Sequence, residues 1–218
     1  MKKLNHKHIV SAALTYELAS RPTERLTCGF LVPLVAESNL KGYLADHQTS
    51  VQDMSPDVRF KLLKWLGCLA LGLAYIQSQK VRHMDIKQAN ILVKGYSVFY
   101  SDFGISKQFQ HHERTTTFRP SDRFTRMYCA PEGISDEGVE KELQDGRLLT
   151  WLRLHEILTV VFGRSVEDFA LFRGTAGNQA YRTHNNECLE WLNKLRRESD
   201  SQGIQQDIMD RMIPLCVR

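Results

Sequence analysis

Apolar residues recur at intervals of three and four in one long segment of the chain. They are Val58, Leu62, Trp65, Leu69, Leu73 and Ile76, with Leu66, Cys68, Ala70 and Leu71 widening the same face. This spacing is typical of one side of a helix. The preceding Ser55, Pro56 and Asp57 favour a helix start, because serine can cap free amides, proline suits the first turn and aspartate complements the positive helix end. We therefore expect a nearly buried helix here.

Shorter apolar runs predict strands on both sides of this helix. Residues 8–18 and 26–36 are rich in Val, Leu and Ile and are separated by a polar stretch, which favours two strands. Residues 91–93 and 98–100 flank a short polar turn around Gly95, a spacing suited to a hairpin. The β-prone segments are therefore short.

The second half of the chain favours helices. Residues 105–129 are polar, with many Thr, Arg and His. Residues 148–162 are strongly apolar and long enough for a core helix, and the chain beyond Gly163 reads as helical and irregular pieces. The pattern predicts an α+β fold with a small β part and a mainly helical part.

Composition narrows the class of protein. The 218 residues are 42% hydrophobic, which is enough for one substantial core, and the net charge of +4 comes from interspersed charges that do not indicate a nucleic acid partner. The five cysteines are scattered and form no Cys-x-x-Cys pair, so reduced thiols are expected. Residues 65–76, the longest apolar segment, are too short to span a bilayer. We expect an intracellular protein, cytoplasmic or nuclear, with no membrane span.

Polar side chains that carry chemistry surround the predicted hairpin. Asp85, Lys87 and Asn90 lie in the loop before its first strand, and Asp102 follows its second strand. Because a hairpin returns the chain to its starting end, these four residues can converge. Phosphoryl transfer from a nucleotide needs such a set: oxygen ligands for Mg²⁺, a carboxylate that orients the attacking hydroxyl, and a cation near the phosphate.

The order of these residues resembles the protein kinase family. The loop from His83 to Asn90 matches its catalytic loop, His-Arg-Asp-x-Lys-x-x-Asn, except that Met84 replaces the arginine. Asp-Phe-Gly follows at 102–104 and Ala-Pro-Glu at 130–132, with Thr125 and Tyr128 before the latter. Each motif alone is an ordinary loop or turn, but three of them in family order are hard to obtain by chance.

The resemblance implies a Ser/Thr protein kinase that transfers the γ-phosphate of ATP to hydroxyls of a protein substrate. It makes Asp85 the catalytic base, and Lys87 the cation at the γ-phosphate that is typical of Ser/Thr-specific members. Asn90, counted with the catalytic residues, and Asp102 become the Mg²⁺ ligands. An activation segment over 102–132 follows from the same resemblance.

Within that segment, Thr115, Thr116 and Thr117 are the expected phosphorylation sites, and substrate would dock along 118–129. Met84 replaces the arginine that usually pairs with a phosphorylated residue, so an intact relative with this loop is expected to be active without phosphorylation of its activation segment. Glu132 has no identifiable arginine partner; it is either unpaired or an exposed carboxylate at a helix start.

The segment before the long helix resembles the family's hinge between lobes. Leu40 to Leu44 looks like the short helix after the hinge, which places the gatekeeper at Val32 and the adenine contacts at Pro33 and Val35. Leu92 would form the apolar floor under adenine. Pro33 keeps its carbonyl and lacks only a donor, so it fits a hinge, and it fits a simple strand-ending proline equally well.

The resemblance divides the chain into a remnant of the ATP lobe with its hinge, residues 1–36, and an incomplete helical lobe, residues 37–218. No residue fills the family's Gly-rich loop or its Lys–Glu pair, so we expect a fragment, a truncated gene prediction or a degenerate kinase that binds ATP poorly. The family's Asp before the helix at 148–162 falls on Gly146, which raises the hypothesis of a reading-frame error across 146–155.

Three functions remain open on the sequence. The first is a Mg²⁺-ATP-dependent kinase, which rests on the catalytic set. The second is a pseudokinase that serves as a protein-binding module, which rests on the missing ATP-lobe residues. The third, a structural helical domain with accidental motifs, is the least favoured because it leaves the four polar residues unexplained together.

Overall fold

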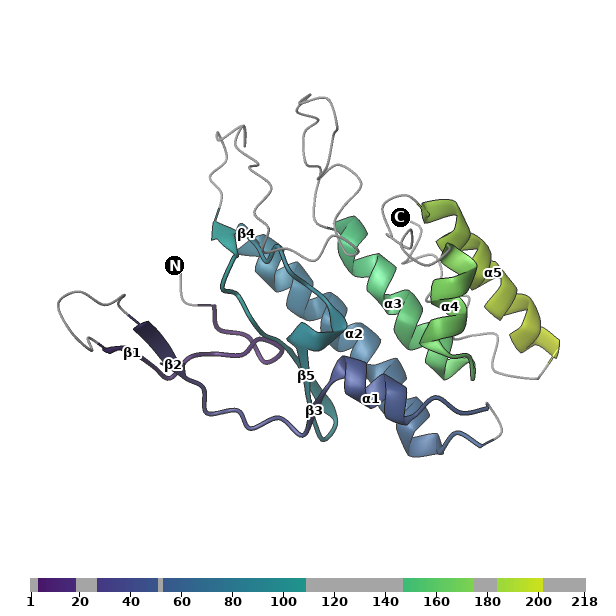
Figure 1. Cartoon of the computed structure of the whole chain (residues 1–218), viewed down its shortest axis with the longest axis horizontal. Coiled ribbons are helices and arrows are strands. Elements are labelled where there is room, and N and C mark those ends of the chain that lie inside the picture. The colour runs from purple at the N-terminus through teal and green to yellow at the C-terminus, as the bar shows by residue number, and fades with distance from the viewer. Residues whose placement is uncertain (1–3, 19–26, 51–52, 109–146, 175–183, 202–218) are drawn as a thin grey trace, which may run out of the picture.

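The computed structural model describes residues 4–18, 27–50, 53–108, 147–174 and 184–201 (Figure 1). Among these residues, three small antiparallel sheets and two α-helices lie in the first half of the chain, and three α-helices follow in the second half. The α+β class predicted from the sequence is therefore confirmed. The division at residue 36 stays a prediction.

The central sheet carries the predicted hairpin. Strand β5 (Ile91–Lys94) pairs with β6 (Ser97–Tyr100) in a register that places Ile91 opposite Tyr100, and β3 (Ser38–Asn39) pairs with the other edge of β5. The turn between β5 and β6 contains Gly95 with a φ of 55°, a conformation that glycine adopts without strain. The hairpin confirms the prediction from residues 91–100.

The first described residues extend this sheet at the β6 end. Ile9 forms a parallel bridge with Tyr100, and the Val10 amide donates to the Tyr100 carbonyl at 2.9 Å. His8 is buried beside β6, with Nδ1 3.0 Å from the Val98 carbonyl oxygen. Burial lowers the pKa of His8, so the ring stays neutral where it packs.

Helix α2 (Pro56–Ser78) is the predicted core helix, and it packs against β6 and a later helix. Its buried side chains include Leu62, Trp65, Leu69 and Ile76. A Cβ at Gly72 would lie 3.0 Å from the Tyr100 ring, so this glycine allows the close approach of helix and sheet.

One part of the helix-start prediction is wrong. Ser55 is the N-cap residue, but its side chain makes no capping hydrogen bond. Asp57 instead pairs with Lys61 at 2.8 Å and accepts a hydrogen bond from the Tyr96 hydroxyl. These two contacts lower the pKa of Asp57, the Lys61 contact being the larger cause.

Residues 65–76, the apolar segment predicted to be too short to span a bilayer, form only part of helix α2. Among the described residues it is the one helix long and apolar enough to cross a bilayer on length and composition. Its apolar face packs on β6 and on a later helix, as in the core helix of a globular domain. The length and composition of α2 are therefore weak evidence for a membrane span.

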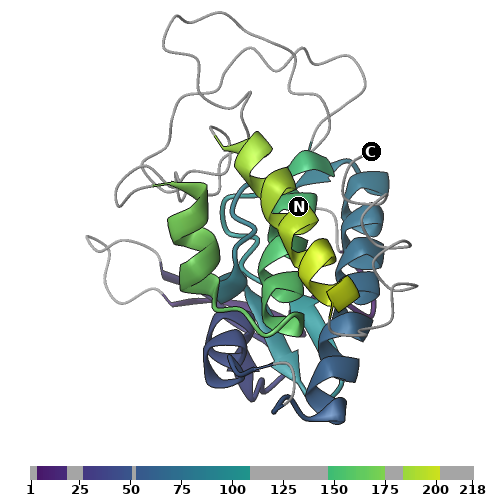
Figure 2. The same ribbon diagram turned by 90° about the vertical axis from the view of Figure 1, so that its right-hand side faces the viewer.

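Three further helices continue the packing on the side of α2 away from the sheet. Helix α3 (Arg147–Val161) lies against α2, and α4 (Val166–Arg173) and α5 (Asn185–Ser201) pack on α3 (Figure 2). Helix α3 matches the predicted helix at 148–162 to within one residue at each end. The order of layers is therefore sheet, α2, α3, and then α4 with α5.

A second hairpin, β1 (Leu14–Leu18) and β2 (Thr27–Leu31), lies at the far end from α5 (Figure 1). Its strands are shorter than the runs 8–18 and 26–36 that predicted them. Helix α1 (Leu40–Asp46) follows β3, and Asn39 caps it by accepting from the Gly42 amide at 3.0 Å. The short helix predicted at 40–44 is confirmed.

Candidate functional site

The candidate site lies in the loop between β4 (Val81–Arg82) and β5, next to the end of β6. Strand β4 pairs with β7 (Lys107–Gln108), so the chain on both sides of the site is fixed by a ladder. The loop ends in a short 3₁₀ turn, η1 (Gln88–Asn90), that leads directly into β5. Its backbone is therefore held at both ends.

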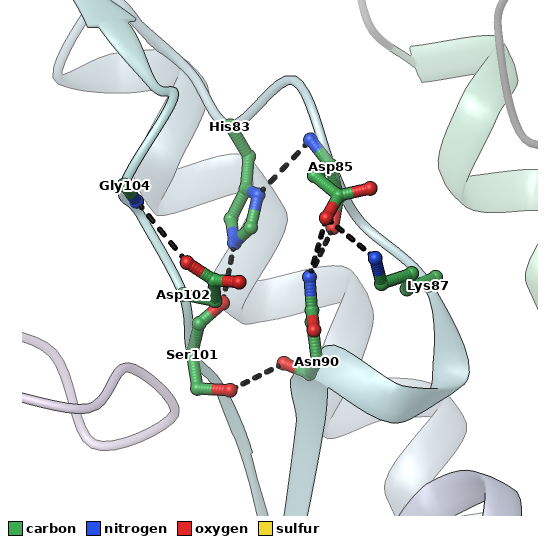
Figure 3. A network of polar contacts seen from close by, with 7 residues as sticks. All are labelled: His83, Asp85, Lys87, Asn90, Ser101, Asp102 and Gly104. Carbon is green, nitrogen blue, oxygen red and sulfur yellow. Dashed lines mark hydrogen bonds and ion pairs between the residues drawn. The ribbon is translucent and has the colours of Figure 1, made fainter. Parts of the chain in front are cut away.

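His83 connects the loop to the end of β6 (Figure 3). Its Nε2 lies 2.8 Å from the Ser101 carbonyl oxygen, and its Nδ1 accepts from the Asp85 amide at 3.4 Å. These roles require a neutral ring with the proton on Nε2. The ring also packs on Phe103, with 4.3 Å between the ring centres. His83 thus fixes Asp85 relative to the segment that carries Asp102.

The Asp85 carboxylate is buried and is oriented by two donors (Figure 3). Its Oδ2 lies 2.7 Å from Lys87 Nζ and 2.9 Å from Asn90 Nδ2. Asn90 Nδ2 also donates to the Asp85 backbone carbonyl at 2.8 Å. A charged group is buried only where such contacts offset its lost hydration. Lys87 and Asn90 therefore stabilise the Asp85 carboxylate in this orientation.

Asp102 lies at the same edge and is linked to Asn90 through Ser101. The Ser101 amide and hydroxyl both donate to the Asn90 carbonyl, at 2.9 and 2.8 Å. The exposed Asp102 has a φ of 58°, and its Oδ1 accepts from the Gly104 amide at 3.4 Å. The structure therefore joins Asp85, Lys87 and Asn90 by direct contact and places Asp102 beside them through Ser101.

The oxygens at this edge suit a magnesium ion. Asn90 donates through its Nδ2 group to Asp85. Its Oδ1 oxygen receives no hydrogen bond from the described residues and can serve as a ligand. Asp102 contributes a carboxylate that is exposed to solvent. Carboxylate and amide oxygens are hard ligands that Mg²⁺ accepts together with water and phosphate oxygens. The residues thus fit the metal that the sequence predicted, and their role as ligands stays a prediction.

The predicted adenine residues lie on the approach to β3. Pro33 and Val35 are exposed, Val35 with 76% of its surface accessible. The segment then joins the central sheet, because the Glu37 amide donates to the Val93 carbonyl at 2.9 Å. Leu92 is half-buried, on the face of β5 opposite the buried Val93. Their contact with a nucleotide stays a prediction.

Several predicted residues lie outside the described part of the chain. These are Thr115–Thr117, Thr125, Tyr128, residues 130–132, the docking segment 118–129, and Gly146. Nothing in the structure bears on their proposed roles.

Sequence reasoning missed three residues that build the site. Ser101 has no role in the sequence prediction, yet it links the two strand ends. Gln88 and Glu156, which form a hydrogen bond at 2.5 Å between the loop and α3, were not singled out. The position of Ser101 directly before Asp102 was a usable signal, whereas the separation of 68 positions between Gln88 and Glu156 left none.

The structure thus shows the buried Asp85 and Asn90 and the half-buried Lys87 on a loop before a hairpin, with Asp102 after it, which is the arrangement that the sequence predicted for phosphoryl transfer. The chain matches the protein kinase domain family over residues 1–145. That match covers more than half of the chain, and the chain belongs to this family.

Individual relatives agree with the family match. A probable receptor-like serine/threonine-protein kinase of Arabidopsis thaliana is 31% identical over 77% of this chain, which spans 36% of the relative. A meiosis-specific serine/threonine-protein kinase of Schizosaccharomyces pombe is 27% identical over 67% of this chain and 31% of the relative. An Ack-related non-receptor tyrosine kinase of Caenorhabditis elegans is 26% identical over 62% of this chain and 12% of the relative. The chain thus spans about a third or less of these relatives.

Proposed function

We propose that this chain carries the catalytic loop and metal-binding edge of a serine/threonine protein kinase, which transfers the γ-phosphoryl group of Mg²⁺-ATP to a protein hydroxyl. The observation that carries the proposal is the Asp85 carboxylate, which Lys87 and Asn90 hold at the edge where Asp102 also lies. Protein kinases as a family use ATP and Mg²⁺.

Each residue has a task that its geometry supports. Asp85 is held in one orientation, as a carboxylate that aligns the substrate hydroxyl and accepts its proton must be. The Lys87 ammonium lies beside that carboxylate, where negative charge builds up on the transferring phosphoryl group. Asn90 and Asp102 offer the oxygens that would hold Mg²⁺. When bound, Mg²⁺-ATP would supply the phosphoryl group and neutralise part of its charge.

The choice of acceptor hydroxyl rests on Lys87 and on two relatives named as serine/threonine kinases. Another relative is named as a tyrosine kinase, so the type of hydroxyl that accepts the phosphoryl group needs an experimental test. The test is transfer of radiolabelled phosphate by the 218-residue chain at millimolar Mg²⁺-ATP, followed by phosphoamino acid analysis of the acceptor protein. We expect phosphoserine and phosphothreonine; phosphotyrosine alone would contradict the specificity.

A protein-binding module without chemistry is the second candidate. Apolar side chains on and near the β1–β2 hairpin are exposed, with accessible fractions of 56% at Leu14, 53% at Leu31 and 76% at Val35. Such a row is typical of a surface that another polypeptide covers. Transfer that is absent from the native chain at millimolar Mg²⁺-ATP would favour this function.

A further inference from the structure

We propose that Gln88 and Glu156 form a positioning pair that holds the catalytic loop on helix α3, and that phosphoryl transfer requires it. The second half of this statement rests on the proposed function. Neither residue belongs to the set that the sequence assigned to chemistry.

The hydrogen bond between Gln88 and Glu156 is short and buried. Gln88 Nε2 donates to Glu156 Oε2 at 2.5 Å, and the accessible fractions of the two residues are 5% and 3%. A carboxylate this deeply buried needs donors to offset its lost hydration, and hydrogen bonds to charged groups are the stronger kind. The pair therefore resists separation more than an exposed hydrogen bond would.

Gln88 lies between two residues of the candidate site, so its contact with Glu156 can fix the position of both. Gln88 directly follows Lys87 and opens the turn η1, in which the Asn90 amide donates to the Lys87 carbonyl at 2.9 Å. Lys87 has an extended backbone, with φ −153° and ψ 161°, and in such a conformation consecutive side chains point to opposite sides. Lys87 thus turns to Asp85 while Gln88 turns to α3. A shift of Gln88 would displace residues on both sides of it.

Glu156 comes from a firmly packed part of α3. Its neighbours Ile157 and Leu158 are fully buried, and the His155 ring stacks on Phe169 of α4 with 5.9 Å between ring centres. One turn later, Thr159 Oγ1 accepts from Trp191 Nε1 of α5 at 2.9 Å. Helices α4 and α5 cover this segment (Figure 2). The helix is therefore a fixed support for the loop.

A purely structural role and a positioning role of the pair predict different effects when the hydrogen bond is removed. If the amide of Gln88 only satisfies a buried carboxylate, its loss lowers global stability and leaves the loop of the folded chain as ordered as before. If the pair positions the loop, its loss loosens residues 85–90 in a chain that is still folded. Hydrogen exchange of individual amides separates these cases.

The experiment uses the 218-residue chain and four variants. Gln88→Leu removes the amide at similar volume, and Gln88→Glu places two carboxylates against each other. The double variant Gln88→Glu with Glu156→Gln restores an amide and a carboxylate with their roles exchanged, which makes it a rescue of the second variant. Glu190→Gln, at an exposed position on α5, is the matched control.

The first readout is exchange of the Asp85 and Asn90 amides, which donate to His83 and Lys87, relative to amides in the middle of α2. We expect exchange at the loop amides to be roughly tenfold faster in Gln88→Leu and Gln88→Glu, with α2 unchanged and the double variant restored. The second readout is transfer, in which we expect kcat to fall roughly tenfold with little change in KM for ATP.

Native protection of both loop amides in Gln88→Leu would overturn the proposal, as would a double variant no better than Gln88→Glu. If the loop amides respond as expected while even the native chain transfers no phosphate, the proposed function fails and the positioning pair stands. The two failures are thus distinguishable.

Discussion

The Asp85→Asn variant is expected to lose phosphoryl transfer by a factor of roughly 10² to 10⁴, the range of general acid–base catalysis by a positioned side chain. Asparagine has the same size and can still accept a hydrogen bond from Asn90, but it cannot take a proton from the substrate hydroxyl. It also leaves Lys87 without the charge 2.7 Å from its ammonium. Radiolabelled transfer from millimolar Mg²⁺-ATP measures the loss.

The control for this variant is Asp46→Asn, which makes the same chemical change at an exposed residue at the end of α1. Its transfer should equal that of the native chain. Thermal unfolding followed by circular dichroism establishes that both variants are folded. Native-level transfer by a folded Asp85→Asn protein would remove Asp85 from the chemistry.

The Trp65→Ala variant is expected to lose about 3–5 kcal/mol of unfolding free energy. Trp65 has no accessible surface, and its ring packs edge-on against Tyr43 with 4.7 Å between ring centres. Alanine would leave a cavity between α2 and its neighbours. Such a loss is a large part of the roughly 5–15 kcal/mol that stabilises a typical domain. Urea denaturation followed by fluorescence or circular dichroism measures it.

Phe60→Ala is the control on the same helix, because 59% of Phe60 is accessible. We expect this change to cost less than about 1 kcal/mol. Equal losses from the two variants would show that the face of α2 assigned to the core is wrong.

The sequence predicted the elements whose signals are local. The three- and four-residue spacing from Val58 to Ile76 located α2, because one face of that helix is continuously apolar. The β5–β6 hairpin followed from two β-prone runs around Gly95, and the approach of Asp102 to Asn90 followed from the hairpin. These inferences needed no contact between distant parts of the chain.

Features that depend on packing could not be predicted in this way. Ser55 has the residue type of a capping residue, yet its side chain makes no capping hydrogen bond. The link from Ser101 to Asn90 uses a backbone carbonyl, and any residue type carries one. The Gln88–Glu156 pair depends on how α3 docks beside the loop, which no local pattern records.

Paramagnetic broadening of amide signals by Mn²⁺-ATP tests the central claim most directly. The claim is that Asn90 and Asp102 share one metal–nucleotide site with Asp85, and millimolar nucleotide makes even weak binding visible. We predict that Mn²⁺-ATP broadens the amide signals of Asp85, Asn90 and Asp102 together, that Mg²⁺-ATP does not, and that Glu190 on α5 is unaffected. Broadening that spares all three residues, or reaches Asp102 without Asn90, would contradict the account.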